Sequence, residues 1–301
     1  MNVLTQIFSI SLNLLKSQYY WLKANHQNLP GSDFFNFGRK IASRLLLNGC
    51  PSPKLFLNPV SIVRFFEFDF AIKSLSEFSN DEKNILDISS PYLFGFYSAE
   101  NFTGNYLYLN PDKKDLALVK KYSKKLNFKM NYKAIEGDAT KLSFGSNSFS
   151  IIISLSVIEH INEDGDMTAI RELWRVLKPE GILILTFPAG KLYSEQFRED
   201  DVYGLNNTQM NNKYFFQRIY DDDSITNRLL NQISDFVILD KEIFGEISPT
   251  FYSEYEKRWK QNGFSETVKD PFYISKYFRS FKNTTELPGM GVVGIALRKT
   301  K

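Results

Sequence analysis

Two short apolar runs on either side of a helical segment stand at the centre of this chain. The first run, 149–154, is β-branched and apolar, as expected of a parallel strand that is buried on both faces. Residues 168–177 follow with a helical period, and their apolar side is formed by Ile170, Leu173, Trp174 and Leu177. Lys178-Pro179-Glu180-Gly181 ends the helix, and residues 182–187 form the second run. Strand, helix and strand in this order predict a right-handed crossover in an open α/β sheet.

Three further runs before this centre predict strands, and two after it complete the sheet. They lie at 84–88, 104–110 and 132–136, with a helix at 118–126 between the last two. Residues 236–244 and 292–298 alternate between apolar and polar, so we expect them to form an antiparallel edge pair at the end of the sheet. Residues 221–233 have a helical period.

Residues 1–80 favour helices and contain no convincing parallel-strand unit. The segment 34–47 is amphipathic, and Cys50-Pro51-Ser52-Pro53 breaks the chain. Asn58 and Pro59 then predict the cap and first turn of a helix that reaches Phe70. We therefore expect a helical N-terminal cap over 1–80 and a second domain over 81–301, with an insertion at about 190–220.

Composition narrows the class of protein. The 301 residues are 43% hydrophobic and 24% charged, which allows a sizeable core. A net charge of +3 gives no support to a nucleic-acid partner. Residues 3–15 are uncharged but too short to cross a membrane and lack the flanks of a signal peptide. The single cysteine, Cys50, fits a reducing compartment, so we expect a cytoplasmic protein without an integral membrane segment.

The central motifs resemble those of a known enzyme family. GDA at 137–139, FSIIIS at 149–154, SVIEHI at 156–161 and RELWRVLKPEGILILTFP at 171–188 occur in the order found in class I S-adenosylmethionine-dependent methyltransferases. The resemblance covers roughly residues 80–190. It implies a Rossmann-like α/β fold, with a seven-stranded, mostly parallel sheet, an antiparallel last strand and helices on both faces. It also implies S-adenosylmethionine as cofactor.

The resemblance assigns cofactor contacts to polar residues at successive strand ends. Where the family has a glycine-rich loop, this chain keeps the acid and has serines, which argues against a dinucleotide site because such a site needs glycines for the pyrophosphate. Asn110 or Asp112 would bind the ribose, while Asp138 and Ala139 would meet the adenine unless Asp138 only caps a turn. The full expected set is Asp87, Ser89, Ser90, Asn110, Asp112, Asp138, Ala139, Ser154 and Ser156.

We expect the acceptor to bind next to these strand ends. The insertion 191–218 is rich in aromatic residues and, together with the helix at 58–70, should close over the methyl group as an aromatic pocket. The rings are Tyr193, Phe197, Tyr203, Tyr214, Phe215 and Phe216, facing Phe65, Phe66 and Phe68. For contact with the acceptor we expect Arg64, Tyr193, Phe216 and Arg218.

His160 is the candidate general base, because a neutral imidazole suits proton removal from a hydroxyl. Its alternative is a purely structural role. Glu159 and His160 resemble the pair of some magnesium-dependent relatives, but Ser156 stands where those relatives carry an acid, so we expect no metal. The leading hypothesis is methyl transfer to a small-molecule acceptor, at oxygen. A catalytically weak scaffold protein is the alternative, supported by the missing glycines, and the sequence does not fix the acceptor.

Overall fold

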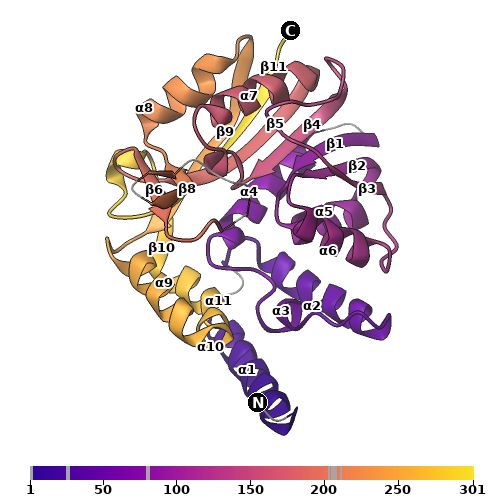
Figure 1. Cartoon of the computed structure of the whole chain (residues 1–301), viewed down its shortest axis with the longest axis vertical. Coiled ribbons are helices and arrows are strands. Elements are labelled where there is room, and N and C mark those ends of the chain that lie inside the picture. Colours follow the sequence, from indigo (N-terminus) through magenta and orange to yellow (C-terminus); the bar gives the residue numbers. More distant parts are fainter. Residues whose placement is uncertain (1–2, 25–27, 79–81, 203, 205–208, 211) are drawn as a thin grey trace.

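The computed structural model describes the chain except for residues 1–2, 25–27, 79–81, 203, 205–208 and 211. Within the described residues, eight strands form one central sheet in the order β10-β9-β11-β5-β4-β1-β2-β3 (Figure 1). The strands are β1 (Glu82–Ile88), β2 (Thr103–Asn110), β3 (Asn131–Glu136), β4 (Phe149–Leu155), β5 (Leu177–Ala189), β9 (Phe236–Glu246), β10 (Phe278–Phe281) and β11 (Gly291–Lys299).

The strand pairing confirms the Rossmann-like expectation and corrects its far edge. From β3 to β5 all neighbours are parallel, whereas β11 runs antiparallel to both β5 and β9. The expected antiparallel pair exists as β9 and β11, but β11 lies inside the sheet and β9 is covered by β10. The described sheet therefore has eight strands where the family pattern predicts seven, because β10 adds one antiparallel strand beyond β9.

Helices cover both faces of this sheet. One face carries α2 (Ser32–Leu47), α4 (Arg64–Glu77), α5 (Tyr92–Asn101) and α6 (Lys113–Ser123), whose buried side chains share one core cluster with the sheet. The other face carries α7 (Gly165–Val176) and the helical segment 222–232, which begins with α8 (Asp222–Ser224) and continues as single π and 3-10 turns. The expected helical segments at 34–47, 168–177 and 221–233 are thus present.

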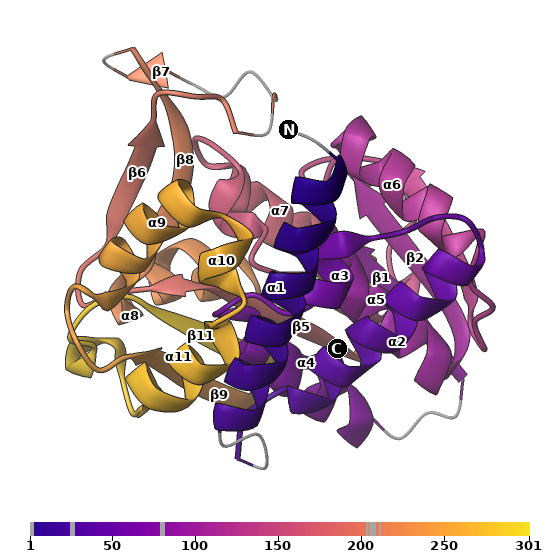
Figure 2. The same cartoon turned by 90° about the horizontal axis from the view of Figure 1, so that it is seen from below.

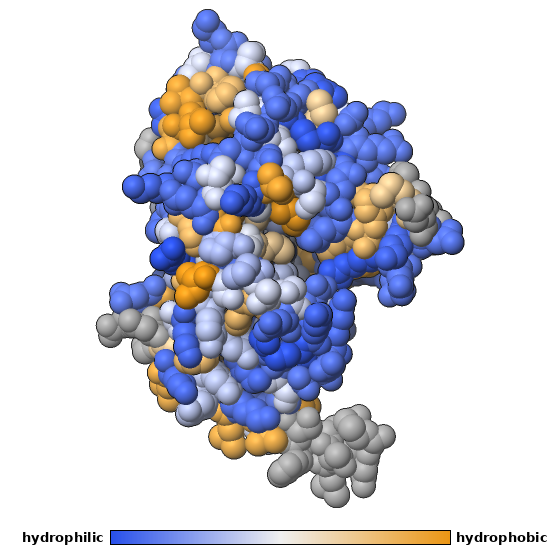
Figure 3. All heavy atoms as spheres, turned by 90° about the vertical axis from the view of Figure 1, so that its left-hand side faces the viewer, coloured by the Kyte–Doolittle hydropathy of each residue, from blue (hydrophilic) through white to orange (hydrophobic). Residues whose placement is uncertain are grey.

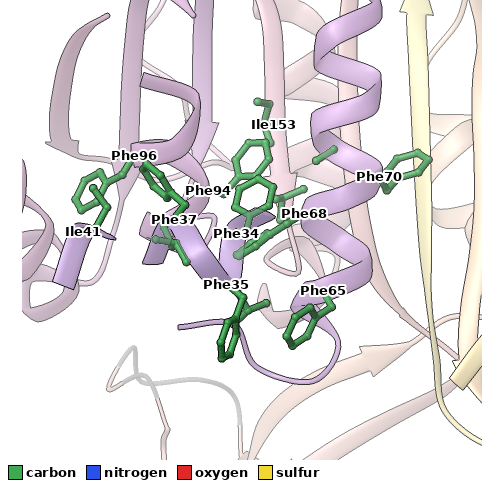
Figure 4. Packing of buried hydrophobic residues seen from close by; sticks show 14 of the residues in the cluster. Phe34, Phe35, Phe37, Ile41, Phe65, Phe68, Phe70, Phe94, Phe96 and Ile153 are labelled. Carbon is green, nitrogen blue, oxygen red and sulfur yellow. The ribbon is translucent and has the colours of Figure 1, made fainter. Parts of the chain in front are cut away.

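Most of the phenylalanines at the N-terminal end belong to the core between these helices and the sheet. Phe34 lies 4.8 Å from Phe68 and 5.9 Å from Phe94 between ring centroids, and Figure 4 shows the three rings together. Phe65 and Phe66 are buried as well. The expectation that rings of 58–70 line an aromatic acceptor pocket is therefore wrong on this side, because those rings fill the space between α4 and its neighbours.

The helix expected to begin at Asn58 is divided in two. A short helix, α3 (Pro53–Leu57), ends at Asn58, and α4 starts only at Arg64. The Asn58 amide donates to Asp270 Oδ2 at 2.8 Å instead of capping a helix. A partner 212 residues away in the sequence thus overrides the local capping signal.

The cap over the carboxyl ends of the strands combines both ends of the chain. α1 (Val3–Lys23) lies between α2 and α3 on one side and the C-terminal helices on the other (Figure 2). The latter are α9 (Phe251–Asn262), α10 (Phe264–Thr267) and α11 (Asp270–Tyr277). Lys16 Nζ donates to Ser265 Oγ at 3.4 Å, and Tyr255 donates to Asp270 at 2.8 Å. Residues 251–277 therefore join the N-terminal cap in space.

The insertion after β5 is a small antiparallel sheet. Its described part contains β6 (Ser194–Arg198), β7 (Gln209–Met210) and β8 (Lys213–Ile219), in the order β6-β8-β7. Tyr203, one of the rings expected in the acceptor pocket, lies outside the described residues. Over the parts of the chain that are described, no helix combines the length and apolar character that crossing a membrane requires.

Candidate active site

The turn after β1 replaces the family's glycines with a serine in left-handed conformation. Ser89 has φ 51°, a region that L-residues rarely adopt, and both its backbone N–H and its hydroxyl donate to the Leu109 carbonyl at 2.9 Å. Ser90 is buried and accepts from the Leu155 N–H at 3.1 Å, so it joins the ends of β1 and β4. The turn is thus shaped without glycine.

Asp87 stabilises this turn through hydrogen bonds of its side chain. Its side chain is buried and accepts from the Ser90 N–H at 3.0 Å and from the Tyr106 hydroxyl at 2.5 Å. Burial raises the pKa of the Asp87 carboxyl to about 6, against the opposing effect of these hydrogen bonds. Both carboxyl oxygens are occupied within the protein, so Asp87 shapes the loop instead of reaching outward.

The end of β2 holds the two candidates for ribose contact, and each has a local task. Asn110 donates from its amide to Asp115 at 2.8 Å and to the Tyr108 hydroxyl at 2.9 Å. Its side-chain oxygen accepts from the Asp112 N–H at 2.8 Å. Asp112 caps α6 by accepting from the N–H groups of Lys114 and Asp115. The carboxylate of Asp112 lies nearer to solvent than the amide of the buried Asn110.

Asp138 follows β3 and is exposed. Its Oδ1 accepts from the Thr140 N–H and hydroxyl, both at 2.8 Å, which is the turn-capping geometry that was the alternative for this residue. The capping bonds use one of its two oxygens. Ala139 beside it is buried in the second core cluster.

The ends of β4 and β5 meet a carboxylate that comes from the cap. Glu67 of α4 is fully buried and accepts hydrogen bonds from the hydroxyls of Ser156 and Thr186, the latter at 3.1 Å. Ser156 has φ 49°, so the chain turns sharply here. Ser154 is buried, and its hydroxyl has no hydrogen-bond partner among the described residues.

Arg64 and Glu159 extend this polar cluster. Arg64 Nη1 lies 2.5 Å from Glu67 Oε2 and 3.4 Å from the Leu155 carbonyl, so its charge is balanced within the cap. Burial raises the pKa of Glu159 to about 8, and the charge of Glu67 adds to the rise. Glu159 is therefore mostly protonated at neutral pH.

His160 ends the 3-10 turn (Ile158–His160) that follows β4. Its Nδ1 lies 2.7 Å from the Phe216 carbonyl, which can only accept, so Nδ1 carries the proton and Nε2 carries the lone pair. Burial, together with the charges of Arg64 and Arg198, lowers the pKa of His160 to about 4, against the opposing effect of the hydrogen bond to Phe216. The imidazole is neutral at physiological pH.

Phe216 joins this histidine to a pocket between β6, β8 and α9. The rings of His160 and Phe216 lie 5.2 Å apart, and the Arg198 guanidinium lies 3.6 Å from the centre of the Phe216 ring. The pocket has a volume of about 250 Å³. It is lined by Gln196, Arg198, Phe216, Gln217, Glu246, Pro249, Tyr252, Ser253, Glu256 and Met290.

Of the four residues expected to bind the acceptor, Phe216 is the one found in the lining of this pocket among the described residues. Arg218 has a side chain only 1% exposed, and its guanidinium donates to the carbonyls of Ile161, at 2.5 Å, and Glu163. Tyr193 donates to Glu195 at 2.8 Å. Arg218 thus fastens β8 to the segment after β4, and its guanidinium is not presented to a ligand.

The described residues contain no group of three or more His, Cys, Asp or Glu side chains arranged to hold a metal ion. The chemistry available at this edge of the sheet is therefore that of a neutral imidazole, buried hydroxyls and a protonated carboxyl, next to a pocket.

Residues 90–185 match the family model described as "Methyltransferase domain". The central part of the chain is therefore similar to the methyltransferase domain of S-adenosylmethionine-dependent enzymes. Its fold is similar to that of the MccD protein, at 15% identity over 80% of this chain and 99% of that chain, with a TM-score of 0.50. It is also similar to coclaurine N-methyltransferase bound to N-methylheliamine and SAH, at 12% identity over 76% and 69% of the two chains, with the same TM-score. No curated protein sequence matches the chain.

The polar residues at the carboxyl ends of the strands, called the rim below, have groups that fit S-adenosylmethionine. The exposed Asp138 keeps an oxygen outside its capping bonds, as an adenine amino group requires, and the buried Ser154 hydroxyl lacks a protein partner within the described structure. Ser89 brings its backbone into the conformation that the family obtains from glycine. No phosphate-binding loop is needed, because S-adenosylmethionine carries no phosphate.

Sequence reasoning missed four residues of this site: Glu67, Thr186, Arg198 and Tyr252. Glu67 could have been found, because it is one of two acids in the aromatic run Phe65–Phe70 and lies three residues after Arg64. Arg198 and Tyr252 have no comparable signal. They lie in the insertion and in a C-terminal segment of mixed pattern, and only the fold brings both into the pocket lining and the charge of Arg198 close to His160.

Proposed function

We propose that this methyltransferase transfers the methyl group to an oxygen atom of a small-molecule acceptor, with His160 as the general base. The observation that carries the proposal is the fixed tautomer of His160, whose Nδ1–H is held by the Phe216 carbonyl at 2.7 Å. This bond turns the lone pair of Nε2 into the basic group of the ring. Bound S-adenosylmethionine would supply a methyl group on a positively charged sulfur.

The residues for cofactor contact are those of the rim. Asp138 and Ala139 would meet the adenine, Asp112 the ribose, and Ser89, Ser154 and Ser156 the methionine part. Asp87, Ser90 and Asn110 would position the loops that carry these contacts, because their polar atoms already bond within the protein.

The acceptor would lie between His160 and the pocket behind Phe216. As the acceptor oxygen forms its bond to the methyl carbon, its proton passes to Nε2, and the resulting imidazolium returns the proton to solvent through the exposed edge of the ring. The side chain of His160 is 17% exposed, so such an exit exists while most water is excluded. Alignment and this proton transfer are the contributions of the protein.

The test combines a panel of acceptors with two variants. Release of the demethylated cofactor is measured with phenols, sugars and amines as acceptors, and each product is identified by NMR. His160→Ala and His160→Gln should each reduce turnover about 10²–10⁴-fold, which is the usual contribution of a general base. Affinity for the cofactor, measured by calorimetry, should stay within about twofold, because His160 lies on the acceptor side.

The pH profile distinguishes a catalytic role of His160 from a structural one. Since the pKa of His160 is lowered to about 4, the acidic limb of kcat/KM should fall near pH 4 and not near the ordinary 6.5 of histidine. Loss of this acidic limb in the two His160 variants supports His160 as the general base. Turnover within a few-fold of the parent with an unchanged limb shows that His160 is structural, and methylation of amines alone refutes transfer to oxygen.

A further inference from the structure

The pocket between β6, β8 and α9 has a lining that selects among chemical classes of acceptor. All of its lining residues lie outside residues 90–185, the part that matches the methyltransferase family. The family match therefore does not describe the chemistry of this lining. The inference below rests on the proposed function, because it takes this pocket as the place where the acceptor binds.

The charged groups of the lining are engaged inside the protein. Arg198 Nη2 lies 2.7 Å from Glu256 Oε1, which Lys260 also approaches at 3.4 Å. Glu246 accepts from the N–H groups of Tyr252 and Met290, both at 2.6 Å. A carboxylate ligand would have to displace Glu256 from Arg198, and an ammonium ligand would find Glu246 and Glu256 already engaged. The pocket therefore favours a neutral molecule.

Neutral hydrogen-bonding groups make up much of the remainder. Gln217 Nε2 donates to Gln196 Oε1 at 2.8 Å, which orients the two amides against each other. This bond leaves the amide nitrogen of Gln196 as a donor and the amide oxygen of Gln217 as an acceptor, side by side. Ser253 and Tyr252 add hydroxyls to the lining. Neighbouring donors and acceptors suit a ligand with several hydroxyl groups, because each hydroxyl both donates and accepts.

The apolar part of the lining consists of two rings and two smaller side chains. Phe216 and Tyr252 supply the rings, and Pro249 and Met290 supply the rest. The face of the molecule drawn in Figure 3 is mostly hydrophilic, with separate hydrophobic patches. A volume of about 250 Å³ equals roughly eight waters at ~30 Å³ each, so a single six-membered sugar ring is of suitable size.

We propose that the acceptor is a neutral sugar: one monosaccharide unit, free or at the end of a glycoside, held by the Gln196–Gln217 pair and the rings of Phe216 and Tyr252. The sugar hydroxyl nearest His160 receives the methyl group. Its oxygen forms the new bond to carbon, its proton goes to Nε2, and the neutral demethylated cofactor is the leaving group.

The experiment uses the full chain in the presence of the demethylated cofactor. Saturation-transfer NMR measures the binding of glucose, methyl α-glucoside and methyl α-rhamnoside, with benzoate and phenethylamine as anionic and cationic probes of similar size. The glycosides distinguish a terminal sugar unit from a free sugar. At least one sugar probe should bind, and the two charged probes should not.

Two variants test the pocket. Gln217→Leu and Gln196→Leu should each weaken sugar binding about tenfold, while cofactor binding by calorimetry stays unchanged and shows that the variants fold. Gln232→Leu is the matched control, since this glutamine accepts from Arg171 far from the pocket lining.

The outcomes separate the two proposals. If the cofactor binds but no sugar does, or if Gln232→Leu weakens the sugar as much as the pocket variants, the sugar proposal is overturned and methyl transfer by His160 is untouched. If sugars bind and are weakened by the pocket variants, yet His160→Ala methylates them at the parent rate, the sugar proposal holds and the general base fails.

Discussion

Glu67 links the cap to the ends of β4 and β5 through its hydrogen bonds. It is the only residue of α4, among those described, that accepts hydrogen bonds from hydroxyls at the ends of both β4 and β5. Its second oxygen meets Arg64 at 2.5 Å. A buried carboxylate costs desolvation energy, and it is tolerated here because a cation and two hydroxyls surround it.

Removing this carboxylate should destabilise the fold more than changing its charge. Glu67→Ala should lower the free energy of unfolding by ~3–5 kcal/mol, because Arg64 and two buried hydroxyls lose their partner. Glu67→Gln should cost less, ~1–3 kcal/mol, since the amide oxygen still accepts. Urea unfolding measures both, and Glu77→Ala, an exposed acid of the same helix, should cost under ~0.5 kcal/mol. Equal losses for Glu67→Ala and Glu77→Ala would contradict the role given to Glu67.

At the residue scale, motif residues were easier to predict than their partners. Asp87, Ser90 and Asn110 do lie at strand ends as expected, but each bonds within the protein, which position along the sequence does not reveal. Asp138 caps a turn, the alternative that its residue type already suggested. The sequence suggests Arg218 as a ligand group because it is a cation in the aromatic-rich insertion, but the structure buries it against backbone carbonyls.

The small sheet of β6, β7 and β8 is held against the segment of His160 by contacts of Arg218. Arg218 donates to the carbonyls of Ile161 and Glu163 and lies 3.7 Å from Asp166, so β8 stays against the segment that carries His160. Asp166 is also bound by Arg228 at 2.7 Å and by the Tyr220 hydroxyl at 2.9 Å. The bonds of Arg218 therefore hold in place the strand that carries Phe216 and Gln217 into the pocket lining.

Arg218→Met should release this element without unfolding the core. Asp166 keeps Arg228 and Tyr220, so we expect a loss of ~2–3 kcal/mol, below the cost of leaving a buried acid alone. Proteolysis should become faster within 194–219, while affinity for the cofactor is kept. Arg171→Met, which removes an exposed arginine of α7, is the control and should leave the cleavage rate unchanged. Equal protection in both variants would show that other contacts hold the sheet.

Elements within the family motifs were predictable, and those outside them were less so. In β4 and β5 the apolar runs are buried on both faces, and for such strands the pattern and the crossover rule leave little choice. The helix expected at Asn58 failed because Asp270 takes its amide. β10 went unnoticed because Phe278–Phe281 is short and directly follows a helix.

Across the whole molecule, buried acids give the fold a dependence on pH. Burial raises the pKa of Glu159 and of Asp270 to about 8. Each group keeps its proton in the folded state at pH values where the unfolded chain has lost it. Their contribution to stability is therefore complete below pH ~4 and is lost as pH rises toward 8. His160 acts in the opposite sense, and its contribution is lost as pH falls from about 6.5 to about 4.

The free energy of unfolding should consequently fall between pH 6 and pH 8. Each acid adds a slope of at most ~1.4 kcal/mol per pH unit. Glu159→Gln and Asp270→Asn should each flatten the curve, and the double variant should flatten it most. Urea unfolding at several pH values measures this directly. A parent curve that is level from pH 6 to pH 8 would refute the protonated state of both acids.

The contact between α1 and α10 bears on the order in which parts of the protein fold during synthesis. Lys16 and Ser265 are 249 residues apart, and Asn58 and Asp270 are 212 apart. On the ribosome, every strand of the cofactor rim has emerged before α9 is even translated, because the chain is made from its N-terminus. Such distant contacts also close slowly. A nascent chain can thus assemble the strands of the rim while α9, which lines the pocket proposed for the acceptor, is still missing, so the proposed selectivity would form last.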